Sequence, residues 1–327
     1  MAAACALALT AVVAPLHGGG PQGRATATDP VTQARYASAT DCEDPEASLD
    51  PALGSPDGVD DPDVRAIVRR GRLKVGIDQN SYLWGFRDPA TGQLAGFDID
   101  IVQAIAKGIF GKGYTPDSVQ YLTVPTAQRV KLIQNGTVDM VVRTMSITCD
   151  RIHDVDFSTA YFTAGQQLLV PKGSPITGYN ASLKGSTVCA ATGSTGLAEL
   201  TDPVKGTDES DAQRFGAKVL TVANQLDCLV RVQLGLADAV FTDNALAAGQ
   251  AAQDPSMTLV GEPVTQEPYG VAMKKDRPDL VRKVNRILAA YEAGGPDSQW
   301  SRSYRHWLAA DLPGITGPPA PKYKKEP

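Results

Sequence analysis

The segment LIQNGTVDMVVRT (132–144) aligns without a gap with RVQLGLADAVFTD (231–243), a second segment of the same chain. In each segment an expected helix ends near a glycine, and an apolar strand follows it. The strands end at Thr144 in the first segment and at Asp243 in the second. The identical pairs include Gln134 with Gln233, Gly136 with Gly235 and Asp139 with Asp238. This repeat, together with the order of the strands, predicts two similar α/β lobes.

Helices and strands alternate on both sides of the repeat. Ile101, Ile105 and Ile109 recur at helical spacing, and Thr126 is a favoured residue type for an N-cap. The alternation is typical of an α/β sheet protein. The expected elements are a short helix and a strand in 64–78, helices at 96–110, 126–136, 224–235, 278–293 and 297–310, and strands at 119–124, 138–142, 187–192, 217–222, 237–243 and 267–275.

The composition is that of a globular protein, and the 327 residues are enough for about two domains. The net charge is -5, and the chain has no basic stripe. A nucleic-acid partner is therefore not expected. The lysine cluster KYKK lies in the Pro-rich segment 313–327, which we expect to be a disordered tail.

The N-terminal part of the chain has the features of an export leader. Residues 2–15 form an apolar run that is too short to span a membrane and fits the apolar region of a secretory signal. A linker rich in Gly, Pro and Asp follows at 17–63, so residues 1–63 are expected to precede the fold. We expect an extracytoplasmic protein, secreted or held at the cell surface, with Cys5 as a candidate for lipid attachment.

Four cysteines remain beyond this leader, and an even number outside the cytosol favours disulfides. Cys189 and Cys228 lie in the same half of the chain, so we expect them to pair, which leaves Cys42 for Cys149. Four buried thiols are the alternative. A metal site is not expected, because Cys-x-x-Cys is absent and the histidines are scattered. The histidines are His17, His153 and His306.

The stretch GQLAGFDIDIVQAIAKGI (92–109) resembles the signature of family 3 solute-binding proteins, which bind polar amino acids for ABC importers. Other motifs fit this family in the same order along the chain. The resemblance covers about residues 64–312 and is greatest to the glutamate/aspartate-binding branch. The motifs are RTMSITCDR (143–151), AATGST (190–195), AVFTD (239–243) and EPYGVAMKK (267–275).

The resemblance implies a two-lobed periplasmic-binding-protein-like fold of type II, in which two α/β lobes are joined by two hinge strands. The lobes of this fold close on the ligand. The chain is expected to leave the first lobe near residue 165 and to return near 268. Lobe 1 would then comprise 64–165 and 268–312, and lobe 2 would comprise 166–267.

The family's ligand, a free amino acid, presents an α-carboxylate, an α-ammonium and a side chain, and buried charges need partners. The resemblance assigns the α-carboxylate to Arg151, whose guanidinium can grip both oxygens. Thr144 and Ser146 supply hydroxyls at a strand end. Ser194 and Thr195 lie in GSTG, where a helix N-terminus would face the anion. The alternatives are a surface ion pair of Arg151 with a neighbouring aspartate and an ordinary capped turn at GSTG.

The α-ammonium is assigned to Asp243, because ligands in such sheets bind at the carboxyl ends of strands. The alternative is an N-cap for the helix that follows. The resemblance assigns the ligand's distal carboxylate to Arg129, for which an exposed helical arginine is the alternative. Arg143 and Arg87 are further candidates for this group. The family's aromatic wall falls on NSYLWGF (80–86), from which we choose Tyr82 over packing of these rings in the core.

The implied function is capture of glutamate, or aspartate, by lobe closure and its delivery to a membrane permease, by a monomer without a cofactor. A glutamine-binding protein or a ligand sensor would use the same pocket. An exported dehydratase on the same fold would need a general acid, for which Glu267 is the candidate. We do not favour an enzyme, because Asp98 and Asp100 of GFDID fall in a helix's first turn, where the helix dipole explains them.

Overall fold

The computed structural model describes residues 42–53 and 62–325, which belong to one compact unit. The apolar run at 2–15, Cys5, most of the linker expected at 17–63 and residues 326–327 lie outside the described residues. Within the described ranges, no helix has the length and apolar character needed to cross a membrane.

The first of two five-stranded sheets consists, in spatial order, of β5 (Val119–Thr123), β1 (Leu73–Ile77), β6 (Met140–Val141), β15 (Ala272–Lys274) and β7 (Val155–Phe157). β1 is parallel to β5 and β6, whereas β15 is antiparallel to β6 and β7. Sheet 1 therefore draws its fourth strand from a part of the chain that lies far downstream of the other four.

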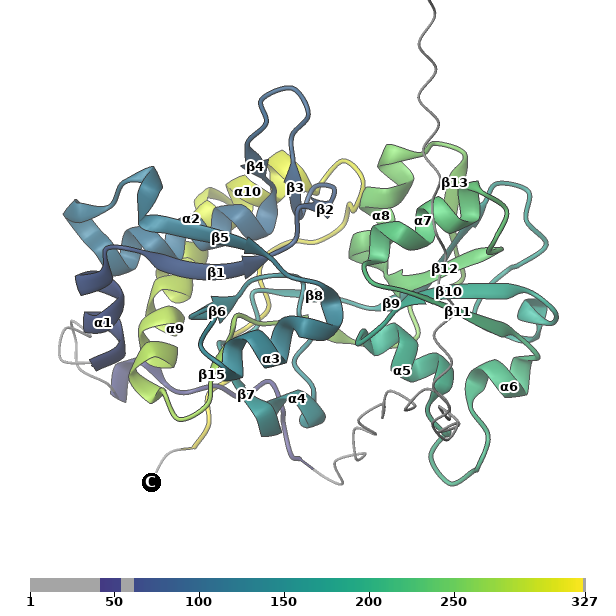
Figure 1. The fold of residues 1–327 in the computed structure, drawn as a ribbon, viewed down its shortest axis with the longest axis horizontal. Coiled ribbons are helices and arrows are strands. Elements are labelled where there is room, and N and C mark those ends of the chain that lie inside the picture. Colours follow the sequence, from purple (N-terminus) through teal and green to yellow (C-terminus); the bar gives the residue numbers. More distant parts are fainter. Residues whose placement is uncertain (1–41, 54–61, 326–327) are drawn as a thin grey trace, which may run out of the picture. The chain divides into compact units, whose positions relative to one another are not determined.

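The second sheet consists of β11 (Lys218–Val222), β10 (Thr187–Ala191), β12 (Ala239–Asp243), β9 (Gln166–Pro171) and β13 (Met257–Val260). β10 is parallel to β11 and β12, and β9 is antiparallel to β12 and β13. Both sheets thus have the same pattern of strand directions, with β6 and β12 in equivalent places (Figure 1). The two-lobed α/β fold predicted from the repeat is confirmed.

Two further strands connect the sheets. β8 (Phe162–Ala164) directly precedes β9 of sheet 2, and β14 (Glu267–Tyr269) precedes β15 of sheet 1. The two strands pair antiparallel, with Glu267 opposite Ala164. Because the chain changes sheets only at this pair within the described residues, we propose the lobe boundaries there, close to 165 and 268.

Helices cover the faces of both sheets (Figure 1). The expected helix at 126–136 is shorter, because residues 126–128 form a 3-10 turn, and Thr126 is therefore not its N-cap. A small sheet of β2 (Asn80–Ser81), β3 (Gly85–Arg87) and β4 (Leu94–Ala95) precedes α2. The helices are α1 (Pro62–Arg70), α2 (Phe97–Phe110), α3 (Arg129–Gln134), α4 (Cys149–Asp154), α5 (Thr195–Thr201), α6 (Asp211–Phe215), α7 (Gln225–Gln233), α8 (Asn244–Gln253), α9 (Pro278–Glu292) and α10 (Gln299–Trp307).

An aromatic cluster fills the core beside the connecting strands. Trp84 meets Phe162 edge-on at 4.8 Å between ring centroids, and Tyr269 lies 5.6 Å from Trp84. Trp84 is fully buried and donates from Nε1 to the carbonyl of Ala245, at 2.9 Å. Because such rings bury a large apolar area, this cluster stabilises the region where the chain changes sheets.

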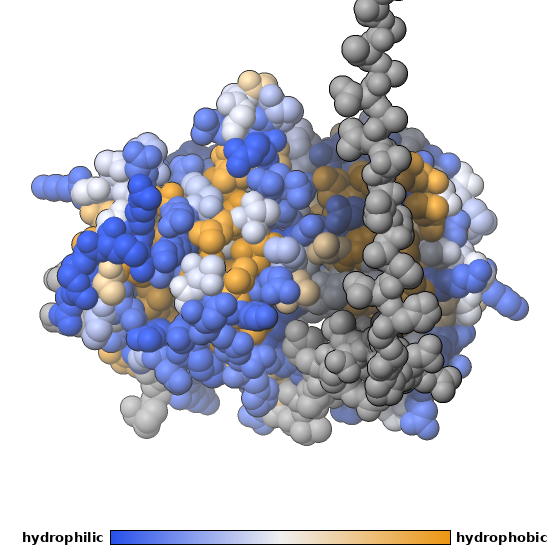
Figure 2. All heavy atoms as spheres, viewed as in Figure 1, coloured by the Kyte–Doolittle hydropathy of each residue, from blue (hydrophilic) through white to orange (hydrophobic). Residues whose placement is uncertain are grey.

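Hydrophilic residues cover much of the face seen in Figure 2, with apolar residues visible between them.

The tail is not disordered as expected, at least over residues 313–325. Ser48 N donates to the carbonyl of Lys322 at 3.0 Å, and Lys324 N donates to the carbonyl of Ser48 at 2.7 Å. Ser48 is buried, and its hydroxyl accepts from Asn285 Nδ2 of α9 at 2.8 Å. Backbone groups of Lys322 and Lys324 thus pair with Ser48, a partner that composition does not reveal.

The structure contains both disulfides that the cysteine count predicted, Cys42–Cys149 and Cys189–Cys228. The first fastens the segment 42–53 to the start of α4. The second joins β10 to α7. Each closes a long loop, which restricts the unfolded chain and so stabilises the fold.

Candidate functional site

A small cavity lies at the carboxyl ends of the parallel strands β6, β10 and β12. The described residues that line it are all polar or charged. They belong to strands of sheet 2 or to segments that follow strands of either sheet. All of the predicted ligand-binding residues line it except Tyr82. The lining residues are Arg129, Thr144, Ser146, Arg151, Gln166, Ser194, Thr195, Gln225, Thr242 and Asp243.

Thr144 has an unusual backbone conformation, with φ at 41°. A β-branched residue rarely adopts a positive φ, so the surroundings must hold it there. Its N–H donates to Asp98 Oδ2 at 3.0 Å, and the Tyr161 hydroxyl donates to Asp98 Oδ1 at 2.8 Å. Asp98 is 2% exposed, and burial raises its pKa to about 7.

The helix dipole is thus an incomplete explanation of the GFDID acids. Asp98 reaches from α2 to the strand end that carries Thr144. Asp100 instead accepts from Ser303 Oγ and Trp307 Nε1 of α10, at 2.6 and 2.8 Å. Two acids in one helical turn therefore have different tasks, of which only that of Asp98 concerns the cavity.

Arg151 lies in α4, whose N-cap Thr148 accepts from the Arg151 N–H at 3.3 Å. The side chain is buried rather than at the surface. Nη1 donates to the carbonyl of Ser146 at 2.8 Å, and Nη2 donates to that of Gly193 at 3.2 Å. These two bonds fix the guanidinium plane at the cavity.

Arg129 is also buried, at 3% exposure, so the exposed helical arginine is the wrong alternative. Its guanidinium donates to three backbone carbonyls: Nε to that of Thr126 at 2.9 Å, Nη1 to that of Arg143 at 3.4 Å and Nη2 to that of Gly193 at 3.2 Å. Burial, followed by the charges of Arg151 and Arg143, lowers the pKa of Arg129 well below its usual value. A nearby anion would relieve both penalties.

The carbonyl of Gly193 accepts from both Arg129 and Arg151. The absence of a side chain at Gly193 also lets its backbone lie close to Ala127. Its φ is +78°, and an added Cβ would lie 2.7 Å from the Cα of Ala127. Only glycine fits this position without a shift of backbone. Ser194 follows as the N-cap of α5 and accepts from Leu197 N at 3.0 Å, so GSTG is a capped turn and also part of the cavity wall.

Asp243 ends β12 at the N-cap position of α8, yet its side chain makes no capping hydrogen bond. It accepts instead from Gln166 Nε2 and, at 2.5 Å, from the Tyr269 hydroxyl. Burial and then the charge of Glu267 raise the pKa of Asp243 to about 7. A cation placed beside it would lower that pKa again.

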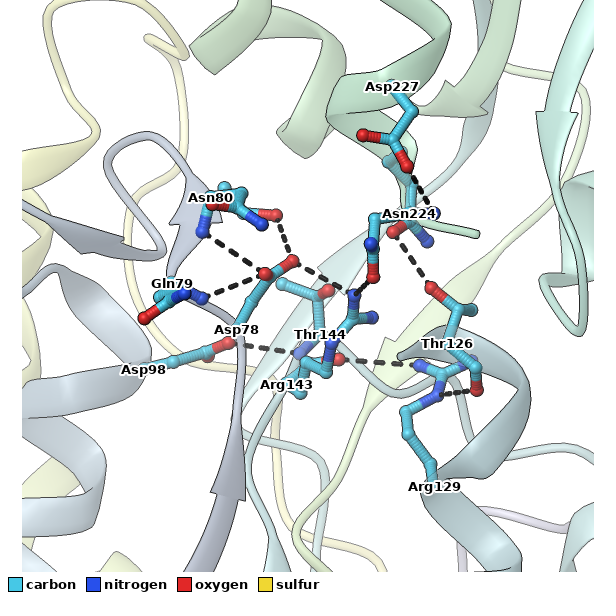
Figure 3. Close-up of polar contacts among 12 residues, drawn as sticks. Asp78, Gln79, Asn80, Asp98, Thr126, Arg129, Arg143, Thr144, Asn224 and Asp227 are labelled. Carbon is cyan, nitrogen blue, oxygen red and sulfur yellow. Dashed lines mark hydrogen bonds and ion pairs between the residues drawn. The ribbon is translucent and has the colours of Figure 1, made fainter. Parts of the chain in front are cut away.

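The other candidates lie away from the cavity. Arg143 is buried, and its Nη2 lies 3.0 Å from Asp78 Oδ2 (Figure 3). Arg87 is exposed and donates to the carbonyl of Gly92 at 2.8 Å. The Tyr82 ring lies edge-on against Phe86, with centroids 5.0 Å apart. Tyr82 is therefore not among the residues that line the cavity, and its role as an aromatic wall stays a prediction.

Three lining residues escaped the sequence analysis: Gln166, Gln225 and Thr242. Gln166 begins β9, and its Oε1 has no hydrogen-bond partner among the described residues. Gln225 could have been found from the repeat, because the offset that aligns the two segments also aligns it with Thr126. Their side chains hydrogen-bond at 3.1 Å across 99 residues of sequence.

Residues 73–310 match the family described as "Bacterial extracellular solute-binding proteins, family 3". The match spans most of the chain, and the chain belongs to this family.

Relatives with known roles agree with this assignment. The ABC transporter glutamine-binding protein GlnH of Bacillus subtilis (strain 168) is 35% identical over 246 residues, which span 75% of this chain and 84% of that protein. The glutamate-binding protein GluB of Corynebacterium efficiens is 28% identical over 269 residues, which span 80% and 85%. The solved structure of an ancestral arginine-binding protein bound to arginine matches with a TM-score of 0.64 and 33% identity, covering 73% of this chain and 99% of that one.

Proposed function

We propose that this chain is an extracytoplasmic amino-acid-binding protein of an ABC importer, which captures glutamate or aspartate and delivers it to a membrane permease. The observation that carries the proposal is the placement of Arg151 and Asp243 in one cavity. A guanidinium and a carboxylate so placed complement the carboxylate and ammonium of a free amino acid. Gln166 Oε1, which lacks a partner among the described residues, would accept another ammonium proton.

The charges of the lining favour an acidic side chain on the ligand. Arg129 and Arg151 carry two positive charges and Asp243 one negative charge, which leaves a net charge of +1 when all three are ionised. Glutamate and aspartate carry a net charge of −1. The distal carboxylate would give Arg129 an anionic partner, which its bonds to carbonyl oxygens do not supply.

Glutamine is the second candidate ligand, because a relative that is 35% identical over 246 residues binds glutamine. An amide oxygen can also accept from a guanidinium, although it does not neutralise the charge. A ligand sensor would use the same cavity. The enzyme alternative has little support, because Glu267 is buried, accepts from Thr265 Oγ1 at 2.9 Å and is not a lining residue.

Replacing Arg129 with alanine is expected to weaken glutamate binding by about 30-fold or more and glutamine binding by less than about fivefold. The reason is that only glutamate loses a charge pair. Calorimetric titration with glutamate, aspartate, glutamine and asparagine measures both effects.

The exposed Arg87 supplies the control, since Arg87→Ala should leave all four Kd values unchanged. Tighter binding of glutamine than of glutamate by the unchanged protein, with equal losses in Arg129→Ala, would instead establish the glutamine candidate. Absence of binding by all four amino acids would contradict the proposed function.

Glutamate binding is expected to weaken as the pH falls below about 7. The pKa of Asp243 is raised to about 7, so its carboxyl is ionised above that pH and protonated below it. A protonated carboxyl does not attract the ligand's ammonium. Calorimetry should show the Kd rising by up to about tenfold per pH unit below 7. The groups that face Asp243 are Gln166, Tyr269, Glu267, Arg129 and Arg151.

Asp98 has a similarly raised pKa, so Asp98→Asn is the control for this measurement. The variant should retain the pH dependence if Asp243 causes it. A Kd that stays constant between about pH 5.5 and 8 would show that Asp243 does not hold the ammonium.

A further inference from the structure

Arg143 is 1% exposed, yet it does not line the cavity. Its Nη2 makes an ion pair with Asp78 at 3.0 Å. The same Asp78 carboxylate accepts from the N–H groups of Gln79 and Asn80, at 2.8 and 3.1 Å, and from Ser81 Oγ at 2.7 Å. Asp78 is therefore held firmly at the end of β1, and it holds Arg143 in turn (Figure 3).

Nη2 of Arg143 also donates to Asn224 Oδ1, at 3.2 Å. Arg143 follows β6 of sheet 1, whereas Asn224 lies between β11 of sheet 2 and α7. Asp227 Oδ2 accepts from Asn224 N at 3.1 Å and fixes the start of α7 (Figure 3). The hydrogen bond thus joins a rigid group on one lobe to a rigid group on the other.

The remaining donors of Arg143 have no partner in the part of the chain that the structure describes. Nε and Nη1 are buried without a hydrogen-bond partner among the described residues. A buried charged donor without an acceptor is costly, whereas separated lobes would let water reach it. Asn224 therefore offsets part of the cost of burying Arg143 in this arrangement, and a stronger acceptor at position 224 would offset more of it.

We propose that Arg143 and Asn224 form a closing contact that sets the balance between open and closed lobes without touching the ligand. A contact present only in the closed state shifts that balance, and the shift changes the affinity for each ligand by one common factor. The order of preference among ligands should stay the same. The inference rests on the proposed function only in its use of ligand affinity as one readout.

The test compares Asn224→Ala and Asn224→Asp with the unchanged protein. Alanine should raise the Kd for glutamate, aspartate and glutamine by a common factor of about 5 to 10. Aspartate, which places a carboxylate opposite Arg143, should lower all three by about threefold or more. Small-angle X-ray scattering without ligand should give a radius of gyration that decreases from the alanine variant to the unchanged protein to the aspartate variant.

Asn180→Ala is the matched control, because Asn180 is an exposed cap of a 3-10 turn that accepts from Ser182 N within its own lobe. It should change neither the Kd nor the scattering. Two results would overturn the proposal: a changed order of ligand preference, or folded variants whose Kd values and radii match those of the unchanged protein. If none of the amino acids binds, the proposed function fails, and the scattering order alone decides whether the closing contact exists.

Discussion

Replacing Arg151 with alanine is expected to raise the Kd for glutamate by about 100-fold or more, on the order of 3 kcal/mol of binding free energy. The variant would leave the ligand's α-carboxylate in a buried cavity without its proposed bidentate partner. It would also release the carbonyls of Ser146 and Gly193, which Arg151 now holds at 2.8 and 3.2 Å. Calorimetric titration measures the loss directly.

Arg151→Lys separates charge from geometry in this prediction. Lysine keeps the positive charge but loses the planar fork, so an intermediate loss of about tenfold is expected. Thermal unfolding without ligand should show that both variants remain folded. If Arg151→Ala binds glutamate with an unchanged Kd, the assignment of the α-carboxylate to Arg151 is wrong.

Replacing Asp98 with alanine is expected to weaken glutamate binding by about 10-fold or more and to destabilise the fold by about 2 kcal/mol. Thr144 N–H and the Tyr161 hydroxyl would lose their acceptor inside the protein. Thr144 would then be free to leave its positive φ, and the cavity wall would lose its shape. Calorimetry and chemical unfolding measure the two effects on the same sample.

Asp98→Asn should restore most of the binding, because an amide oxygen can accept from Thr144 while the amide nitrogen donates to Tyr161. Asp100→Asn is the matched control on the same helical turn, since Asp100 contacts Ser303 and Trp307 instead. It should affect stability more than binding. An Asp98→Ala variant that loses stability but keeps its Kd would restrict Asp98 to a structural role.

The repeat and the order of the strands predicted most of the fold, namely two similar α/β lobes. The repeat placed Thr144 and Asp243 at equivalent strand ends, and the structure brings both to one cavity. Strand ends are predictable because apolar runs stop where burial stops. The repeat did not predict Arg151 and Arg129 as site residues, because a sequence does not reveal which face of a short helix is buried. These two arginines were predicted only from the motifs of the resemblance.

Apart from the two disulfides, contacts between distant segments could not be predicted from the sequence. The sequence offers three neighbouring aromatic residues at 80–86, and none of them lines the cavity. Nothing in the sequence marked Gln166 as a site residue, because a glutamine at the start of a strand is common. Residues 322–324 of the tail pair with Ser48, and composition describes a segment without its partners.

The position of β15 has a consequence for the order in which this protein folds. All strands of sheet 2 lie within residues 166–260, so that sheet can form from one continuous stretch. Sheet 1 needs β15 (272–274) between β6 and β7, although its other strands are made first. Bringing such distant segments together is slow. We therefore expect sheet 2 to be the earlier folding unit, and sheet 1 to remain incomplete until residue 274 has been synthesised.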